Sequence, residues 1–248
     1  MNFISYGNEN NKSLLFIHGL ASTADLCFKP LLTYLDDYYV IFCELDGHCD
    51  FESEDLLSME KTIDKIEKYI LNEMDGEVYG LCGFSMGATI AVELISRGNI
   101  CAKKVLLDAA ITSEMGLMAM PFTWAFIFGT NRIKNGKTIP KFLLDKIMGK
   151  DNNSVIEMMY PKIRESTIKN ACKYIYHYKF SKNLKKFSNP VLFWRGSEEP
   201  IPKKSEKKLK EYLPQMKSEV FKGLGHGQFL HEYPQEYAKK LKIFLESR

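Results

Sequence analysis

Short apolar runs alternate along this chain with longer stretches in which apolar and polar residues mix. The apolar runs are rich in β-branched and aromatic residues, which is typical of buried strands. We expect strands at residues 14–19, 38–45, 78–84, 104–110, 190–196 and 218–225, preceded by a weaker one at 3–6. We expect helices between them, at residues 24–35, 54–74, 86–97, 203–213 and 228–245. Continuously apolar strands that alternate with helices predict an α/β protein with a mostly parallel, doubly wound sheet.

One interval breaks this alternation. Residues 111–188 separate two predicted strands by 78 positions, far more than a connection of this kind needs. The interval is helix-like and rich in methionine and aromatic residues. We therefore expect residues 1–110 and 189–248 to form the core that contains the sheet. Residues 111–188 are expected to form an inserted helical cap over the carboxyl ends of the strands, where open α/β sheets bind their ligands.

The strongest chemical motif is the sequence GFSMG at residues 83–87. It follows a predicted strand and opens a predicted helix, which is the context of a nucleophile elbow. A strand that turns directly into a helix strains the backbone at Ser85, and side chains at positions 83 and 87 would collide, so both flanks need glycine. The turn would direct the Ser85 hydroxyl out of the sheet, beside the positive end of the helix.

With this motif, the chain resembles the α/β-hydrolase superfamily from end to end. Within that superfamily it is similar to serine hydrolases of the carboxylesterase type that carry a helical cap. HGL at 18–20 is similar to the oxyanion loop of that family. LDGHCD at 45–50 is similar to its D-x-x-G-H-G segment, with Cys49 at the usual second glycine. GSEEP at 196–200 and GLGHG at 223–227 resemble the acid and histidine loops. The resemblance implies the α/β-hydrolase fold and a triad in the chain order serine, acid, histidine.

A base for Ser85 must take and return a proton near neutral pH, which suits histidine. His226 lies directly after the last predicted strand, in a glycine-flanked loop that can bring its imidazole over the sheet. We therefore expect His226 to be the base and His18 to brace the oxyanion loop. The histidines expected to have no catalytic role are His18, His48, His177 and His231.

The acid of the triad is open among three carboxylates. The aspartate of the family's G-x-x-D-x-x-x-P pattern falls on Glu199 here, and a glutamate can also orient an imidazole. Glu198 is adjacent to it in the sequence. Asp108 ends the strand after the nucleophile helix, where some relatives carry their acid. Glu199 is the first choice, with Asp108 and Glu198 as alternatives.

Two further groups complete the expected site. The backbone N–H groups of Leu20 and Met86 are expected to form the oxyanion hole, and their apolar side chains are no obstacle because the main chain does this work. Phe122, Trp124 and Phe126, in the predicted cap, are expected to line an apolar substrate pocket. Each of these three aromatic residues alone would more often belong to the core between cap and sheet.

Composition and charge exclude several other classes of protein. The 248 residues carry 34 basic and 31 acidic side chains, and this even balance argues against a nucleic acid or an anionic membrane as partner. The longest apolar stretch, 115–128, is too short for a membrane span and contains Pro121. The six cysteines lack metal-binding spacing, and residues 1–10 lack a signal-peptide pattern. We therefore expect a cytoplasmic protein without a metal or other cofactor.

These observations predict a serine hydrolase that cleaves carboxylic esters of small to medium apolar acyl groups through an acyl-enzyme. A thioesterase would use the same residues, and the resemblance also extends to lyases of the menaquinone-pathway type. A non-catalytic ligand receptor on the same fold is the alternative from another class. The expected partner is a small-molecule ester or thioester, and the expected state is a monomer or a homodimer.

Overall fold

The computed structural model describes residues 1–48, 55–150, 152 and 154–247. Within them, seven strands form one sheet in the order β1-β3-β2-β4-β5-β6-β7. The strands are β1 Asn2–Tyr6, β2 Ser13–Ile17, β3 Tyr39–Glu44, β4 Glu77–Phe84, β5 Cys101–Asp108, β6 Val191–Gly196 and β7 Lys217–Phe221. β1 pairs with β3 in the antiparallel sense, and the other neighbouring pairs are parallel. The predicted, mostly parallel α/β sheet is confirmed.

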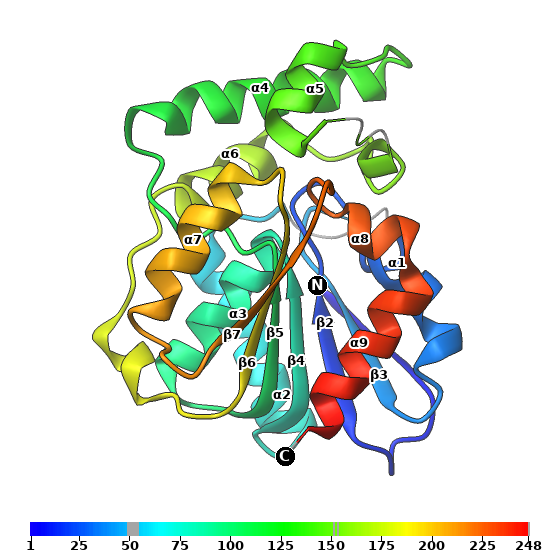
Figure 1. The fold of residues 1–248 in the computed structure, drawn as a ribbon, viewed down its shortest axis with the longest axis vertical. Helices are drawn as coiled ribbons and strands as arrows, with labels where there is room; N and C mark the ends of the chain where they lie inside the picture. The colour runs from blue at the N-terminus through cyan, green and yellow to red at the C-terminus, as the bar shows by residue number, and fades with distance from the viewer. Residues whose placement is uncertain (49–54, 151, 153, 248) are drawn as a thin grey trace.

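Helices cover both faces of this sheet (Figure 1). Outside residues 111–188 they are α1 Ala24–Phe28, the 3-10 helix η1 Lys29–Tyr34, α2 Met59–Glu73, α3 Met86–Arg97, α7 Pro200–Lys210, α8 Gln228–Glu232 and α9 Pro234–Glu246. Two predicted helices are interrupted next to a proline. The stretch 24–35 changes from α1 to η1 beside Pro30, and the stretch 228–245 breaks before Pro234, because proline has no N–H to continue a helix.

Alternate side chains of the strands belong to two apolar cores, one on each face of the sheet. In β2, Leu15 and Ile17 lie in the core beneath α2 and α3, whereas Leu14 and Phe16 lie in the core beneath α1 and α9. Side chains of a strand point alternately to opposite faces, so burial on both faces fixes the register of β2. The carboxyl ends of the central strands are therefore held in fixed positions.

The connection between β5 and β6 forms a helical layer beyond the carboxyl ends of the strands, at the top of Figure 1. Its elements in this layer are η2 Gly116–Met118, α4 Ala119–Lys134, α5 Lys141–Met148, η3 Ser154–Ile156 and α6 Glu165–Ile175. The connection then returns to the amino ends of the strands, where η4 Lys182–Lys186 packs on α3 before β6 begins. We call residues 111–188 the cap segment, and their division from the core as a separate domain stays a prediction. Within the described ranges, no helix combines the length and the apolar character needed to cross a membrane.

One predicted feature cannot be placed in this fold. Cys49, which stands at the family's usual second glycine, lies outside the described residues, as does the first residue of the helix expected at 54–74. Residues 55–58 are described and are not helical, so the helix begins later than predicted: α2 starts at Met59, behind the capping side chain of Ser58. The Ser58 hydroxyl accepts the Lys61 N–H at 3.2 Å, so a local hydrogen bond sets the start of α2.

The residue that ends α3 allows a test of what stops this helix. Gly98 follows α3 with a φ of 72°, in the left-handed region, and a Cβ added there would meet no atom within 4 Å. We expect Gly98→Ala to lower the free energy of unfolding by about 1 kcal/mol, because L-residues other than Asn and Asp avoid this region. Urea denaturation measures the difference. Gly98→Asn is the matched control and should cost less; an alanine variant as stable as the wild type would contradict this role of Gly98.

Candidate active site

Ser85 lies where β4 ends and α3 begins, at the carboxyl edge of the sheet. Its φ of 54° and ψ of −113° are strained for a residue with a side chain. The Ser85 N–H donates to the Asp108 carbonyl at 2.8 Å, and the Ser85 carbonyl accepts the N–H groups of Ala88 and Thr89. Hydrogen bonds to β5 and within α3 therefore hold the strained turn.

Glycine stands on both sides of Ser85 because three elements meet at this turn. A Cβ on Gly87 would overlap the backbone carbonyl of Ile17 in β2, and a Cβ on Gly83 would overlap the backbone at the start of α3. Only residues without a side chain allow β2, β4 and α3 to approach one another this closely. These contacts agree with the reason expected for glycine at both positions.

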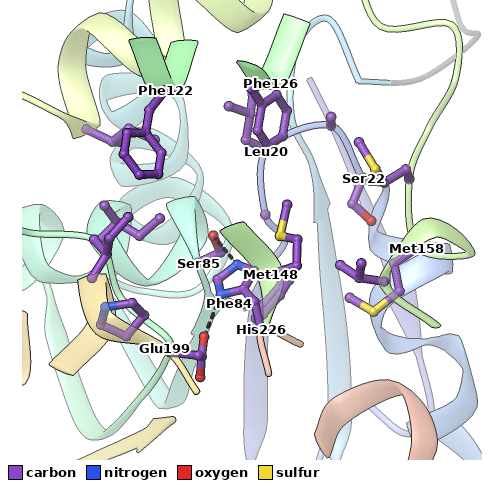
Figure 2. Close-up of a pocket in the computed structure, with 18 of the residues that line it drawn as sticks. Leu20, Ser22, Phe84, Ser85, Phe122, Phe126, Met148, Met158, Glu199 and His226 are labelled. Atoms are coloured by element: carbon purple, nitrogen blue, oxygen red, sulfur yellow. Dashed lines mark hydrogen bonds and ion pairs between the residues drawn. The ribbon is translucent and has the colours of Figure 1, made fainter. Parts of the chain in front are cut away.

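His226 reaches Ser85 from the loop that follows β7. Its Nε2 atom lies 2.9 Å from the Ser85 hydroxyl oxygen, within hydrogen-bond distance (Figure 2). The backbone of this loop is bonded to the cap segment, because the His226 N–H donates to the Met148 carbonyl at 2.7 Å. The side-chain amide of Asn152 also donates to the His226 carbonyl, at 2.8 Å. The cap segment thus helps to fix the position of the imidazole.

Glu199 lies on the other side of the imidazole, directly before α7. One of its carboxylate oxygens is 2.6 Å from His226 Nδ1, and the other accepts the N–H of Gly196 at the end of β6. The Glu199 residue is only 4% exposed. A carboxylate at Nδ1 favours the tautomer in which Nδ1 carries the proton and Nε2 accepts from Ser85. The three side chains form one continuous hydrogen-bonded chain (Figure 2).

The two alternative carboxylates lie elsewhere. Glu198 is exposed, and its carboxylate accepts the Ser197 hydroxyl at 3.3 Å. Asp108 is buried at the end of β5, and within the described residues its Oδ2 atom has no hydrogen-bond partner. Burial and the nearby charge of Glu199 raise the pKa of Asp108 well above its usual range, so both oppose ionisation of this carboxyl group. Of the three candidate acids, the structure brings Glu199 to the histidine.

His18 is buried beneath the loop that carries Leu20. Its Nδ1 is 2.8 Å from the Gly19 carbonyl, and its Nε2 accepts the Leu45 N–H at 3.1 Å. Burial lowers the pKa of His18 to about 3, so a neutral imidazole braces the loop. No described hydrogen bond joins Ser85 to the remaining histidines, which are His48, His177 and His231. In the part of the chain that the structure describes, no three His, Cys, Asp or Glu residues form a group that could hold a metal ion.

Leu20 and Met86 offer backbone N–H groups near the Ser85 hydroxyl. Met86 is the first residue of α3, where N–H groups have no partner inside the helix. The loop of Leu20 lies against the elbow, since a Cβ on Gly19 would be 3.3 Å from the Ser85 Cβ. Among the described residues, the Leu20 N–H has no hydrogen-bond acceptor. Both groups therefore suit the oxyanion hole that the sequence predicts.

The loop that carries Leu20 is held from two sides. Ala21 has a φ of 56°, and its carbonyl accepts the Tyr160 N–H of the cap segment at 2.8 Å. On the other side, a carboxylate oxygen of Glu44, at the end of β3, accepts the Ala24 N–H at the start of α1. The second oxygen of Glu44 is buried without a partner among the described residues. Burial raises the pKa of Glu44 to about 7, so ionisation of this carboxyl group opposes folding.

A cavity of about 80 Å³ lies above Ser85, between the sheet and the cap segment. Phe122 and Phe126 line it from α4, one helical turn apart (Figure 2). Trp124 lies outside this cavity with 57% of its surface exposed, because it projects from the other side of the helix. The structure thus places two of the three predicted pocket residues in the cavity. Other apolar lining residues include Leu20, Ile111, Met148, Val155, Met158, Met159, Ile175 and Tyr176.

Sequence reasoning missed several residues that shape this site. Met148, Met158 and Met159 line the cavity from the cap segment, and Asn152 holds the loop of His226. The methionine-rich composition of the cap segment indicates an apolar lining, but no periodic pattern assigns individual positions to it. Asn152 stands in a polar run without a motif, so its two backbone acceptors, the carbonyls of Met148 and His226, are known only from the fold.

The sequence matches the model of the alpha/beta hydrolase family over residues 14–240, nearly the whole chain. The chain belongs to the alpha/beta hydrolase family. No curated protein matches the sequence.

Solved structures share the fold of this alpha/beta hydrolase. A protein assigned to the same family from Desulfitobacterium hafniense has a TM-score of 0.87 at 22% identity, covering 99% of this chain and 100% of its own. An esterase from Exiguobacterium antarcticum has a TM-score of 0.76 at 18% identity, covering 99% and 95%. A structure from work on carboxylesterases of Nitrososphaera gargenis has a TM-score of 0.77 at 17% identity, covering 98% and 93%. At these identities the likeness shows the fold alone.

Replacing Glu44 by glutamine should change how the stability of this alpha/beta hydrolase depends on pH. Above its ordinary pKa of 4.5 the unfolded chain releases a proton that the folded protein retains up to about pH 7. The stability of the wild type therefore falls as pH rises through this interval and levels off above it. Glutamine does not ionise, so the variant should gain up to about 3 kcal/mol relative to the wild type across the interval.

Urea unfolding of both proteins, repeated at several pH values between about 4 and 8, measures this difference. The variant keeps a carbonyl oxygen for the Ala24 N–H, so its loss of stability at low pH should be small. A difference between the two proteins that stays constant over the whole range would contradict a buried, protonated Glu44.

Proposed function

We propose that this alpha/beta hydrolase cleaves carboxylic esters with small to medium apolar acyl groups, with Ser85 as the nucleophile. The observation that carries the proposal is the hydrogen-bonded chain from Ser85 through His226 to Glu199, with distances of 2.9 and 2.6 Å. A serine hydroxyl bonded to an oriented imidazole is the arrangement that activates this nucleophile. The esterases among the proteins of similar fold are consistent with the proposal.

In the first half-reaction, the Ser85 oxygen attacks the ester carbonyl carbon while His226 Nε2 takes the hydroxyl proton. The carbonyl oxygen becomes an oxyanion, which the N–H groups of Leu20 and Met86 would stabilise. The imidazolium then gives its proton to the leaving alkoxide, so the alcohol departs and an acyl-Ser85 ester remains. Glu199 holds the imidazole in place and compensates its positive charge while it carries the proton.

In the second half-reaction, a water molecule takes the place of the alcohol. His226 Nε2 removes a proton from the water as its oxygen attacks the acyl carbon. The same backbone N–H groups would hold the second oxyanion. Its collapse breaks the bond to the Ser85 oxygen, which receives the proton back from His226. The products are one carboxylic acid and one alcohol, and the enzyme returns to its starting state.

The lining of the cavity supports an apolar acyl group. Apart from His226 and Glu199, the described lining holds no acidic or basic side chain. Charged pocket residues would favour a coenzyme A thioester or the substrate of a lyase, so this lining supports a simple ester over those alternatives. The cavity volume of about 80 Å³ suits a short chain. Burial of that chain against Phe122 and Phe126 would stabilise its binding, since each buried methylene contributes about 0.8 kcal/mol.

Turnover of p-nitrophenyl esters tests the proposal directly. The wild type should hydrolyse short-chain esters, and Ser85→Ala should lower kcat/KM by on the order of 10³-fold or more. Glu199→Gln should lower it by on the order of 10²- to 10⁴-fold, because the glutamine does not compensate the imidazolium charge. Asp108→Asn should change it only a few-fold, because Asp108 has no described hydrogen bond to His226.

Three outcomes of these assays would contradict the proposal. A wild type that hydrolyses no ester, yet binds a ligand equally well with and without the Ser85 hydroxyl, would indicate a receptor. Hydrolysis of an acyl-coenzyme A far faster than of the matching simple ester would indicate a thioesterase. An Asp108→Asn variant as impaired as Glu199→Gln would show that the acid has been assigned to the wrong carboxylate.

The choice of acyl chain should depend on Phe126. Shortening this side chain enlarges the cavity, so Phe126→Ala should raise the ratio of kcat/KM for octanoate to that for acetate by roughly tenfold. The measurement is a series of soluble p-nitrophenyl esters of increasing chain length. Trp124→Ala is the matched control on the same helix, because Trp124 lies outside the cavity and its loss should leave the ratio unchanged. Equal shifts in both variants would show that Phe126 does not line the acyl site.

A further inference from the structure

Three elements of the cap segment, η2, α4 and α5, carry large apolar side chains that are exposed in the described part of the chain. We call this group the cap surface, and its residues are Leu117, Met118, Met120, Trp124, Phe128 and Phe142. These six make up nearly half of the thirteen large apolar side chains that are exposed among the described residues. Leu117 and Phe142 are 97% and 76% exposed. Apolar exposure concentrated in one segment of the chain points to an interaction site.

None of the residues of the cap surface lines the catalytic cavity. Its elements are η2, α4 and α5, at the top of Figure 1. Along α4, Met120, Trp124 and Phe128 recur every fourth residue and therefore share one face of the helix. Phe122 and Phe126 lie on another face and line the cavity above Ser85. The cavity accounts for the inner apolar face of α4, and nothing in the described chain accounts for the outer one.

Positive charge is concentrated in the same part of the chain. Residues 116–150 contain six lysine and arginine residues and one acidic residue, a net charge of +5. The other 213 residues carry 28 basic and 30 acidic side chains, a net charge of −2. The even balance of basic and acidic residues over the whole chain argues against an anionic membrane as partner, but it conceals the basic segment 116–150. The basic residues are Arg132, Lys134, Lys137, Lys141, Lys146 and Lys150.

Cations also lie directly beside the exposed aromatic rings. The Arg132 guanidinium is 5.6 Å from the centre of the Phe128 ring, and Lys169 Nζ is 5.6 Å from the centre of the Trp124 ring. Aromatic rings with neighbouring lysine and arginine side chains suit the boundary of a lipid bilayer. There the rings enter the headgroup region, and the cations meet the lipid phosphates.

We propose that the cap surface binds peripherally to the surface of an anionic lipid bilayer, with α4 lying in the plane of the interface. A bilayer of this kind offers an apolar layer to Trp124 and Phe128, and negative charge to Arg132 and Lys169 beside them and to the other basic residues of the segment. A second copy of this chain fits less well, because contact through the same surface would bring two segments of net charge +5 together. The proposal concerns the outer face of the cap segment and holds whichever ester the enzyme cleaves.

Trp124 is a built-in probe for this binding. The only other tryptophan in the sequence is Trp194, which is fully buried, so a change in emission reports on Trp124. Vesicles of phosphatidylglycerol and phosphatidylcholine in equal parts, added at low ionic strength, should shift the emission of the full chain to shorter wavelength. Vesicles of phosphatidylcholine alone should bind at least about tenfold more weakly, and added salt should weaken binding to the anionic vesicles. No shift and no co-sedimentation with anionic vesicles would overturn the proposal.

Co-sedimentation of variants with the same anionic vesicles locates the binding surface. Met120→Ser combined with Trp124→Ser should weaken binding on the order of tenfold or more. Ile243→Ser is the matched control, because Ile243 is 62% exposed on α9, outside the cap segment, and its loss should leave binding unchanged. Circular dichroism should show the same helix content in all of these proteins. Equal losses in the two variants, or no loss in the first, would overturn the proposal.

Charge variants test the electrostatic part separately. Lys134→Gln with Lys137→Gln should weaken vesicle binding several-fold, whereas the exposed pair Lys222→Gln with Lys239→Gln should not. Two other results would overturn the proposal in favour of a different occupant. One is a dimer in sedimentation velocity that the Met120→Ser and Trp124→Ser substitutions abolish. The other is binding of single-stranded RNA through the cap surface while anionic vesicles are left unbound.

Discussion

The position of Ser85 depends on how closely α3 passes over β2. Gly87 lies against the Ile17 carbonyl and Gly83 against the first turn of α3, which leaves no room for a Cβ on either residue. The chain can make this turn only if Ser85 takes a φ of 54°, a conformation that costs on the order of 1–3 kcal/mol. Hydrogen bonds of the Ser85 backbone to β5 and within α3 offset this cost. The hydroxyl and the first N–H group of α3 are thereby brought to one place at the edge of the sheet.

Behind this turn, the fold accommodates one buried negative charge beside the histidine. The Glu199 carboxylate is bonded on one side by His226 and on the other by the Gly196 N–H. Asp108 ends the neighbouring strand, and two ionised carboxylates this close would repel each other. Burial and the charge of Glu199 raise the pKa of Asp108 well above its usual range, so ionisation of Asp108 is disfavoured beside Glu199.

The sequence predicts the secondary-structure elements of this molecule well, but it predicts individual side-chain contacts poorly. Each of the seven strands overlaps a run that the sequence predicts as a strand. The central strands are the easiest to predict because burial on both faces leaves a continuous apolar pattern, whereas the edge strand β7 ends at Phe221, four residues before the predicted end at 225. The elbow around Ser85 is equally predictable, since only glycine fits two positions before and two positions after this serine. Trp124 is predicted to line the pocket, but it lies on the outer face of α4. The orientation of a helix decides which of its residues reach a pocket, and composition does not determine that orientation. Similarly, Glu198 and Glu199 are neighbours in the sequence, and only the path of the loop before α7 separates an exposed carboxylate from a buried one.

The central claim is that the fold makes the Ser85 hydroxyl an activated nucleophile. Intact-mass measurement after incubation with a fluorophosphonate probe tests it most directly, because the probe reacts with such a serine whatever ester is the substrate. We expect a single adduct on the wild type and none on Ser85→Ala, with both proteins folded by circular dichroism. A folded wild type that takes no label, or a Ser85→Ala variant labelled to the same extent, would contradict the claim.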